Sequence, residues 1–299
     1  MPLFFLISGF LYRIEPDAKA YLIGKCAHLL VPYAVFLLLL SGIQGLPLLV
    51  SGDFRELGRL GGRVLMGGRY LTDWTGVFWF ITCLFLTQQF ANWAFRNFEE
   101  RYLWLLSGAL VLLAFATATF FSAYKLPWNA DKVLFAFPLF FAGWKFRSTD
   151  SVDSLAFFFG SVVLSTLGLL LVSFGFIETI DMKRSFYGTA FVSVFFAICI
   201  SVSLMHICKL LPDGSVADRL LSGVGKASMA IMFLHQAVNF ALEDFGLRVL
   251  GVRALAALIL PLLFYYFCVQ FRFTNAFFLG SKADLFSYLP MLKSSMRKN

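Results

Sequence analysis

The sequence predicts an all-α, polytopic transmembrane helical bundle with eight full spans and a partial N-terminal span, forming a single domain over residues 1–299. Two observations carry this prediction. Apolar residues make up 60% of the chain. Charged residues make up only 14%, whereas a soluble domain has about 25%. These proportions exclude ordinary soluble, disordered and disulfide-stapled proteins as classes.

The spans follow from the length of the apolar runs, because a helix needs about 20 apolar residues to cross a hydrocarbon core of about 30 Å. We identify eight such runs, at residues 27–50, 75–95, 102–124, 132–146, 154–177, 186–211, 224–242 and 254–271. The run at 132–146 is the shortest. A ninth run at residues 1–11 is about half a span long, and it lacks the basic leader and cleavage site of a signal peptide.

The distribution of Lys and Arg predicts the orientation, because cytoplasmic loops are enriched in these residues. When successive connections are assigned alternately to the two sides of the membrane, one side has 15 Lys and Arg residues and the other has 10. The richer side comprises residues 12–26, 96–101, 145–153, 209–226 and the tail from Arg272. We therefore expect a multi-pass protein of the cell membrane with a cytoplasmic C-terminus. Nine spans would leave Met1 on the outer side, so we expect a tenth helix upstream of it.

Neither the net charge nor the cysteines indicate a soluble ligand. The charge of +8 does not predict nucleic-acid binding, because the basic residues are scattered as ones and twos. The five cysteines form no CxxC pair, and we expect Cys83, Cys199, Cys208 and Cys268, inside apolar runs, to be small buried side chains. Single Cys–His pairs are too few for a zinc site, so we assign no metal.

Ionisable side chains inside membrane spans are costly and therefore functional candidates. His235 is the most informative, because steps of about 100° per residue place it on one helical face with Ser228, Asn239 and Glu243. Its imidazole is either a general base for a hydroxyl or a group that hydrogen-bonds across helices. We take His235 as the candidate catalytic residue and place Ser228 and Asn239 in a substrate pocket.

The aromatic runs at residues 78–80 and 137–141 also have two interpretations. They either line a substrate groove or pack in the interior, and packing is the general expectation in a chain with 38 phenylalanines. Trp79 is the strongest candidate for a substrate pocket, because Thr75, Thr82 and Gln89 occupy nearby helical positions.

Arginines spaced by four lie in the connection at residues 51–74. Arg55, Arg59 and Arg63 would share one face of a helix. They either hold an anionic head group or phosphate, or belong to a segment at the membrane interface. Several glycines in the connection weaken any helix there.

Five stretches carry a family resemblance: MPLFFLISGF at residues 1–10, KCAHLLVPY at 25–33, VFWFITCLF at 77–85, NADK at 129–132 leading to PLFFAGW at 138–144, and GKAS at 225–228 leading to FLH at 233–235. In this order and spacing they resemble the membrane-bound acyltransferase family 3, particularly its branch related to fucose 4-O-acetylases.

The resemblance implies an enzyme with ten membrane helices that moves an acyl group, often acetyl from acetyl-CoA, to a hydroxyl of an envelope carbohydrate or lipid-linked sugar. Acetyl-CoA would be the donor, with no bound cofactor. The family's basic pair before its third helix corresponds to Lys25 and His28, which the resemblance makes donor-binding residues.

Two departures accompany the resemblance. The basic pair usually reads Arg-x-x-Arg, whereas this chain has Lys25-Cys26-Ala27-His28. The family's main catalytic arginine and histidine belong to a first helix that would lie upstream of Met1, which leaves open whether the chain as it stands is active. The alternative function is a transporter or flippase for a small solute or lipid-linked sugar, although the spans show neither the embedded acids nor the repeats typical of transporters.

Overall fold

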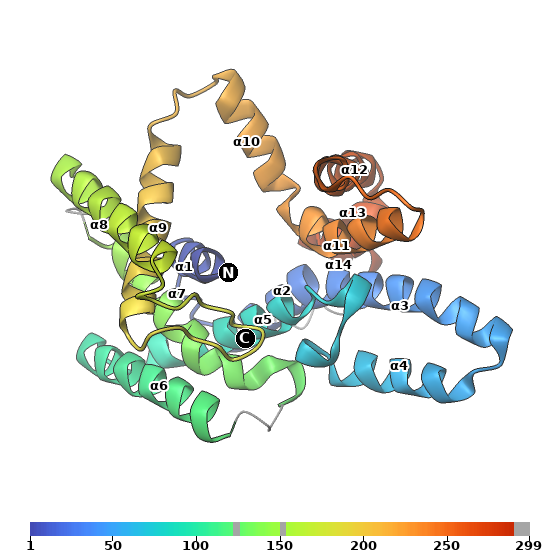
Figure 1. Ribbon diagram of the computed structural model, residues 1–299, viewed down its shortest axis with the longest axis horizontal. Coiled ribbons are helices and arrows are strands. Elements are labelled where there is room, and N and C mark those ends of the chain that lie inside the picture. Colours follow the sequence, from blue (N-terminus) through green and yellow to red (C-terminus); the bar gives the residue numbers. More distant parts are fainter. Residues whose placement is uncertain (122–125, 150–153, 290–299) are drawn as a thin grey trace. The chain divides into compact units, whose positions relative to one another are not determined.

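The computed structural model describes residues 1–121, 126–149 and 154–289. Within these ranges the chain is helical, with one isolated bridge between Asp181 and Phe186 (Figure 1). It divides into two compact units. Unit 1 comprises Met1–Pro16, Leu86–Leu126 and Ala130–Asp218, and unit 2 comprises Asp17–Phe85, Pro127–Asn129 and Arg219–Asn299. The single domain over 1–299 stays a prediction.

The helices of unit 1 are α1 (Pro2–Phe10), α6 (Glu100–Phe120), α7 (Val133–Arg147), α8 (Leu155–Ser173) and α9 (Val192–Lys209). Those of unit 2 are α2 (Ala18–Lys25), the π-helix η1 (Cys26–Leu30), α3 (Val31–Ser51), α4 (Phe54–Met66), the 3₁₀ turns η2 (Gly68–Tyr70) and η3 (Asp73–Thr75), α11 (Ser228–Asp244), α12 (Leu250–Gln270), α13 (Arg272–Phe278) and α14 (Lys282–Tyr288). The chain passes between the units within α5 (Trp79–Asn97), η4 (Pro127–Lys132) and α10 (Val216–Lys226).

The all-helical prediction is confirmed, and the described part of the chain contains five helices long and apolar enough to cross a membrane. These are Ala18–Ser51, Glu100–Phe120, Leu155–Ser173, Val192–Lys209 and Leu250–Gln270. The predicted runs at 75–95, 132–146 and 224–242 form α5, α7 and α11, which are shorter or more polar. The count of eight spans therefore stays a prediction. Residues 122–124, 150–153 and 290–299, which contribute to the predicted spans and connections, lie outside the described residues.

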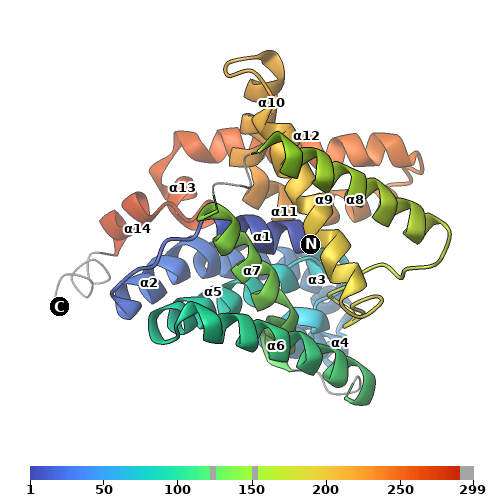
Figure 2. The ribbon, with the colours of Figure 1, turned by 90° about the vertical axis from the view of Figure 1, so that its left-hand side faces the viewer.

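In unit 1, α1 and α7 cross with their backbones almost in contact. A Cβ added to Gly9 would stand 1.8 Å from the carbonyl oxygen of Phe140, and one added to Gly143 would stand 1.9 Å from that of Leu6. The phenylalanines within residues 135–141 are at most 1% exposed, so the packing interpretation of the run at 137–141 is confirmed. Although only nine residues long, α1 is thus an integral part of this core. Figure 2 shows α7 beside α6, the other helix that packs on it.

Small polar side chains join α8 to α9. The hydroxyls of Ser165 and Ser203 are 2.9 Å apart, and Ser203 donates a 3.0 Å hydrogen bond to Ser161. All three serines are buried. Such hydroxyl contacts between membrane helices contribute about 0.6 kcal/mol each and specify register more than they add stability.

A buried charge lies at the start of α7. Lys132 is 0% exposed, forms an ion pair with Asp131, and donates a hydrogen bond to Ser185 from the connection between α8 and α9. Removing one partner of a buried pair leaves an uncompensated charge. This contact therefore fixes the connection at residues 178–185 against the start of α7.

The residue that follows α1 gives a test of unit 1 packing. Tyr12 donates a 2.5 Å hydrogen bond to Asn92, and burial raises the pKa of Tyr12 to about 12 from 10.0. Because the native pKa is the higher one, this group's contribution to stability is complete below pH 10 and is lost as the pH rises towards 12. We expect Tyr12→Phe to remove this pH dependence and to lower the free energy of unfolding at neutral pH by about 1 kcal/mol.

Denaturant unfolding of the detergent-solubilised protein at pH 7 and pH 11 measures both effects. Phe95→Leu, which changes a ring neighbour of Tyr12 without removing the hydroxyl, is the control. If Tyr12→Phe loses as much stability at pH 11 as the wild type does, then a different group titrates there.

In unit 2, α3 and α4 form a helical hairpin (Figure 1). Gly52 makes the turn at φ +73°, and the Asp53 side chain caps α4 by accepting from the Glu56 backbone N–H at 3.1 Å. The helix forms despite its glycines, with Arg55, Arg59 and Arg63 spaced along it. None of its residues is buried, so the arginine side chains are accessible for either of the two predicted roles.

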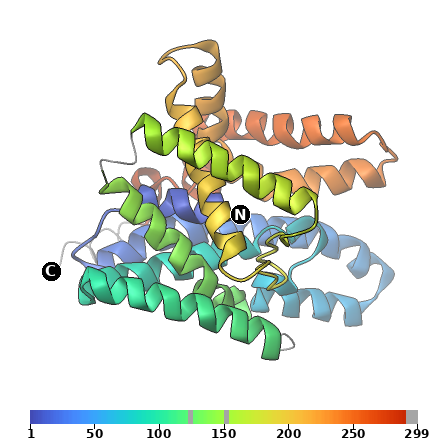
Figure 3. The same ribbon diagram turned by 60° about the vertical axis from the view of Figure 1, so that its left-hand side comes forward.

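Aromatic rings hold α3 and α11 together. Phe233 of α11 lies 4.8 Å from both Phe36 of α3 and Phe78, measured between ring centroids, and all three side chains are 0% exposed. α12 runs beside α11, and Figure 3 shows this pair in orange. The core of unit 2 therefore sets the position of α11, which carries His235.

The cysteine prediction is confirmed for Cys83, Cys199 and Cys268, which are buried, and it is wrong for Cys208, which is exposed. Cys208 lies in the last turn of α9, where the helix end is less covered by neighbouring elements.

Candidate functional site

Lys25 and His28 lie where α2 passes into α3 through the π-helix η1. The backbone N–H of Val31 bonds to the carbonyl of Cys26, five residues earlier. Pro32 explains the wider turn, because it has no N–H to offer to the carbonyl of His28 four residues before it. Such π-turns inside α-helices are frequent at functional sites.

The segment around Gly280 packs directly on this turn. The Nδ1–H of His28 donates to the carbonyl of Gly280 at 3.2 Å. Gly280 has φ +64°, and a Cβ there would stand 2.4 Å from the carbonyl oxygen of His28. Asp284 secures the segment by accepting from Asn275 at 2.7 Å and from Ser281 at 2.9 Å. Both the backbone angle and the close approach therefore require glycine at position 280.

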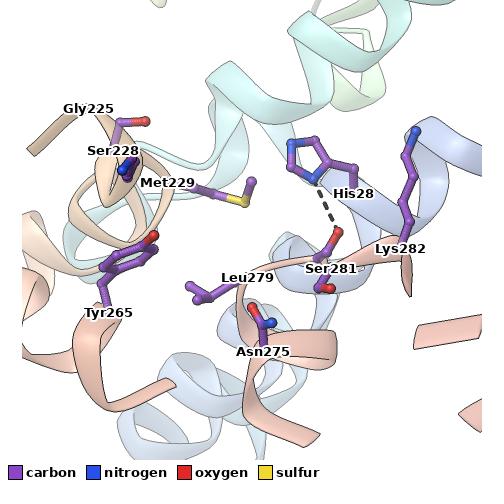
Figure 4. Close-up of a pocket in the computed structure, with 11 residues that line it drawn as sticks. His28, Gly225, Ser228, Met229, Tyr265, Asn275, Leu279, Ser281 and Lys282 are labelled. Atoms are coloured by element: carbon purple, nitrogen blue, oxygen red, sulfur yellow. Dashed lines mark hydrogen bonds between the residues drawn. The ribbon is translucent and has the colours of Figure 1, made fainter. Parts of the chain in front are cut away.

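Between η1, α10, α11, α12 and the α13–α14 segment lies a pocket of about 590 Å³ (Figure 4). This volume is within the range of about 300–1,000 Å³ typical of small-molecule sites. We call it the cationic pocket. It is lined by His28, Gly225, Lys226, Ser228, Met229, Tyr265, Asn275, Leu279, Gly280, Ser281 and Lys282.

The lining of the cationic pocket favours an anion. It offers two ammonium groups, an imidazole, three hydroxyls and an amide, and none of the described residues that line it is a carboxylate. The nearest acid in the segment, Asp284, is held by Asn275 and Ser281. Lysine binds phosphate as a point charge, and hydroxyl and amide groups add directional hydrogen bonds.

Lys25 lies next to the cationic pocket without lining it. Its ammonium is 5.3 Å from the centroid of the Tyr21 ring. The preceding residue, Gly24, is in contact with Lys282, whose Nζ would be 2.9 Å from a Cβ added there. The predicted donor-binding pair is therefore divided between the wall of the pocket (His28) and its edge (Lys25).

His235 lies on α11, seven residues after Ser228, or about 10 Å further along the helix axis. Its Nδ1 contacts the carbonyls of Ile231 at 2.8 Å and Met232 at 3.0 Å. Since a carbonyl only accepts, Nδ1 carries the hydrogen, and the neutral ring presents Nε2 as a proton acceptor. That tautomer is the one a general base needs.

The three predicted substrate-pocket residues have different environments. Ser228 lines the cationic pocket. Asn239 follows His235 by one helical turn and is half-buried on α11. Trp79 is 3% exposed and packs edge-on against Phe80 at 6.3 Å, and it is not among the residues that line the cationic pocket.

Sequence reasoning did not select Lys226, Tyr265, Asn275 and Lys282 as site residues. Lys226 could have been identified from the sequence, because it belongs to the GKAS stretch that carried the family resemblance. Lys282 contributed only to a charge count for the tail. Tyr265 and Asn275 had no local signal, because folding alone brings α12 and α13 to η1 and α11.

Comparison with known proteins assigns the family. A family model described as an acyltransferase domain, that of acyltransferase family 3, matches residues 1–270, which include α1 to α12. No curated protein and no solved structure matches the chain. With its five candidate spans, the chain is a multi-pass membrane protein. The extent of the match shows that it belongs to the acyltransferase family 3 of membrane acyltransferases.

Proposed function

We propose that the chain is an O-acyltransferase that moves an acetyl group from acetyl-CoA to a hydroxyl of an envelope carbohydrate or a lipid-linked sugar. The observation that carries the proposal is the cationic pocket, whose lining offers hydrogen-bond donors and positive charge without a carboxylate. Coenzyme A bears its negative charge on phosphates, so this lining suits the nucleotide end of the donor.

The reaction needs a base near the acceptor hydroxyl. The hydroxyl oxygen attacks the thioester carbonyl carbon, a C–O bond forms, and the C–S bond breaks. We assign His235 Nε2 to take the hydroxyl proton and then to return it to the departing thiolate, which leaves as free coenzyme A. The short distance along α11 from Ser228 to His235, about 10 Å, suits the extended pantetheine arm of the donor.

The position of the cationic pocket supports the proposed orientation. Lys226 and Lys282 come from two connections that the Lys and Arg count assigns to the cytoplasm, and Lys25 comes from a third. Acetyl-CoA is a cytoplasmic metabolite, so a donor site on that side is consistent with a cytoplasmic C-terminus in the cell membrane. Glycan mass analysis of a deletion strain tests the proposed function, and an unchanged acetyl content would contradict it.

We also propose that the chain belongs to the fucose 4-O-acetylase-related branch, on the five sequence stretches that carry the resemblance.

The lysines of the cationic pocket give a direct test of donor binding. We expect the double variant Lys226→Gln, Lys282→Gln to raise the KM for acetyl-CoA by up to about thirtyfold, because two exposed charge contacts to phosphate are lost, each contributing up to about 1 kcal/mol. The change in kcat should be small, since neither ammonium touches the reacting atoms.

The measurement is initial-rate kinetics with labelled acetyl-CoA in nanodiscs. Arg219→Gln is the matched control, because Arg219 is exposed on the same helix as Lys226 and does not line the pocket. If the double variant keeps the wild-type KM for acetyl-CoA, the donor does not bind in this pocket.

A further inference from the structure

Unit 2 contains a second pocket, of about 150 Å³, whose lining includes carboxylates as well as an arginine. It lies between the second half of α3, the α4 helix and the η3 turn, and we call it the mixed-charge pocket. It is lined by Gln44, Leu48, Glu56, Leu60, Arg63, Leu71, Thr72, Asp73 and Thr75.

The side chains that line the mixed-charge pocket include acidic and basic groups. They also include both hydrogen-bond donors and hydrogen-bond acceptors. Asp73 accepts a 2.9 Å hydrogen bond from the Thr72 hydroxyl, and Glu56 is paired with Arg59 outside the pocket. Among the described residues, the side chains of Gln44 and Arg63 form no hydrogen bond or ion pair, so an amide and a guanidinium are available to a ligand. Leu48, Leu60 and Leu71 supply an apolar wall.

This chemistry selects against phosphate and favours a neutral polyol. Two carboxylates in so small a space repel an anion, in contrast to the cationic pocket. A sugar hydroxyl both donates and accepts, so it can satisfy a carboxylate and a guanidinium together, while the C–H face of the ring packs on leucines. At about 150 Å³, the pocket is below the ~300 Å³ lower limit typical of sites that enclose a whole small molecule, so it suits part of a sugar ring and is too small for a nucleotide.

The mixed-charge pocket is also placed correctly for an acceptor. Gln44 is 16 residues beyond His28 along η1 and α3, or about 24 Å, so the two pockets lie towards opposite ends of one helix. The connection at residues 51–74, which supplies most of the lining, belongs to the side that the charge count assigns to the outside.

The η3 turn connects this pocket to the helix that carries His235. A Cβ added to Gly76, directly after η3, would stand 3.1 Å from Oε1 of Gln236, the residue that follows His235. This Oε1 is buried with no hydrogen-bond partner among the described residues. A hydroxyl that reaches past η3 would therefore approach α11 next to the proposed base.

We propose that the mixed-charge pocket binds the sugar ring of the acyl acceptor, an inference that rests on the proposed acyl transfer. Asp73 and Arg63 hold its hydroxyls, and the leucines contact its C–H face. The ring enters from the end of α3 opposite the donor and approaches α11 near Gln236.

Two measurements test this assignment. Saturation-transfer NMR with the nanodisc-embedded protein uses fucose, galactose, glucose and N-acetylglucosamine as probes, and initial-rate kinetics gives the KM for the acceptor. We expect Asp73→Ala and Arg63→Ala to reduce sugar saturation at least fivefold and to raise the acceptor KM about tenfold, with the acetyl-CoA KM unchanged. Arg55→Ala, two turns earlier on α4 and outside the pocket, should match the wild type in both.

The outcomes separate this inference from the proposed function. If the wild type transfers acetyl groups while both variants keep its acceptor KM and its sugar contacts, the acceptor site lies elsewhere and the inference is overturned. If the wild type shows sugar contacts that both variants lose but no protein transfers acetyl, the pocket assignment stands and the proposed function fails. Absence of both sugar contacts and transfer in the wild type overturns both. Unfolding midpoints within a degree of the wild type confirm that the variants are folded.

Discussion

Gly143→Ala is expected to destabilise unit 1 strongly. The added Cβ would stand 1.9 Å from the carbonyl oxygen of Leu6, so the backbones of α1 and α7 must separate. That separation opens gaps beside the buried phenylalanines of residues 135–141. Overpacking of a core against a flexible side chain costs about 1–3 kcal/mol, and here the clashing atom is backbone, so we expect a loss of about 3 kcal/mol or more.

The thermal unfolding midpoint of the solubilised protein and its monodispersity on size-exclusion chromatography measure the effect. Gly9→Ala should behave alike, because it clashes with Phe140 across the same crossing. Gly108→Ala on α6, where a Cβ meets nothing within 4 Å, should leave the midpoint unchanged or raise it slightly. An unchanged midpoint for Gly143→Ala would mean that α1 and α7 do not cross at these two glycines.

His235→Ala is expected to give the largest loss of activity. Removing a general base lowers a rate by about 10²–10⁴-fold, and we expect the rate of acetyl transfer to fall within this range in a chain that is active. The bond from Nδ1 to Ile231 lies within one helix, so its loss should have little effect on expression or on the unfolding midpoint.

His206→Ala provides a matched control, because His206 makes the same kind of bond, from Nδ1 to the carbonyl of Val202 at 2.9 Å. It is buried in unit 1, and its replacement should affect stability more than the rate at saturating substrates. A His235→Ala protein that keeps the wild-type rate would assign this histidine to packing, and the base would have to be sought elsewhere.

The helices were predictable because length and hydropathy are local properties. α8 and α12 coincide closely with their predicted runs, since long stretches of leucine, valine and phenylalanine have no other stable state in a bilayer. α5 also lies close to its predicted run, but it is not among the five candidate spans, because it contains polar residues such as Gln88 and Asn92, which are buried within the protein. Hydropathy registers these side chains as unfavourable for a span although the fold covers them.

The polar face of α11 was predictable for the same reason, because it depends on residues close together in the sequence. The spacing of Ser228, His235 and Asn239 follows from 3.6 residues per turn, and the structure keeps them on one helix. Trp79 shows the limit of such reasoning, because polar neighbours at helical spacing predicted a pocket position and the side chain is buried beside Phe80. Which face of a helix packs against other helices depends on the residues of those helices, and the sequence of the helix itself does not specify them.

By itself, the sequence determined the helical membrane class, the family resemblance and the position of His235 on a polar helical face, because each depends on residues close together in the chain. Only the tertiary structure decided which residues line the two pockets. The cationic pocket joins His28 to Gly280, about 250 residues apart, and the mixed-charge pocket joins α3 and α4 to the η3 turn. Such sites arise from packing between distant segments, and neither composition nor periodicity contains that information.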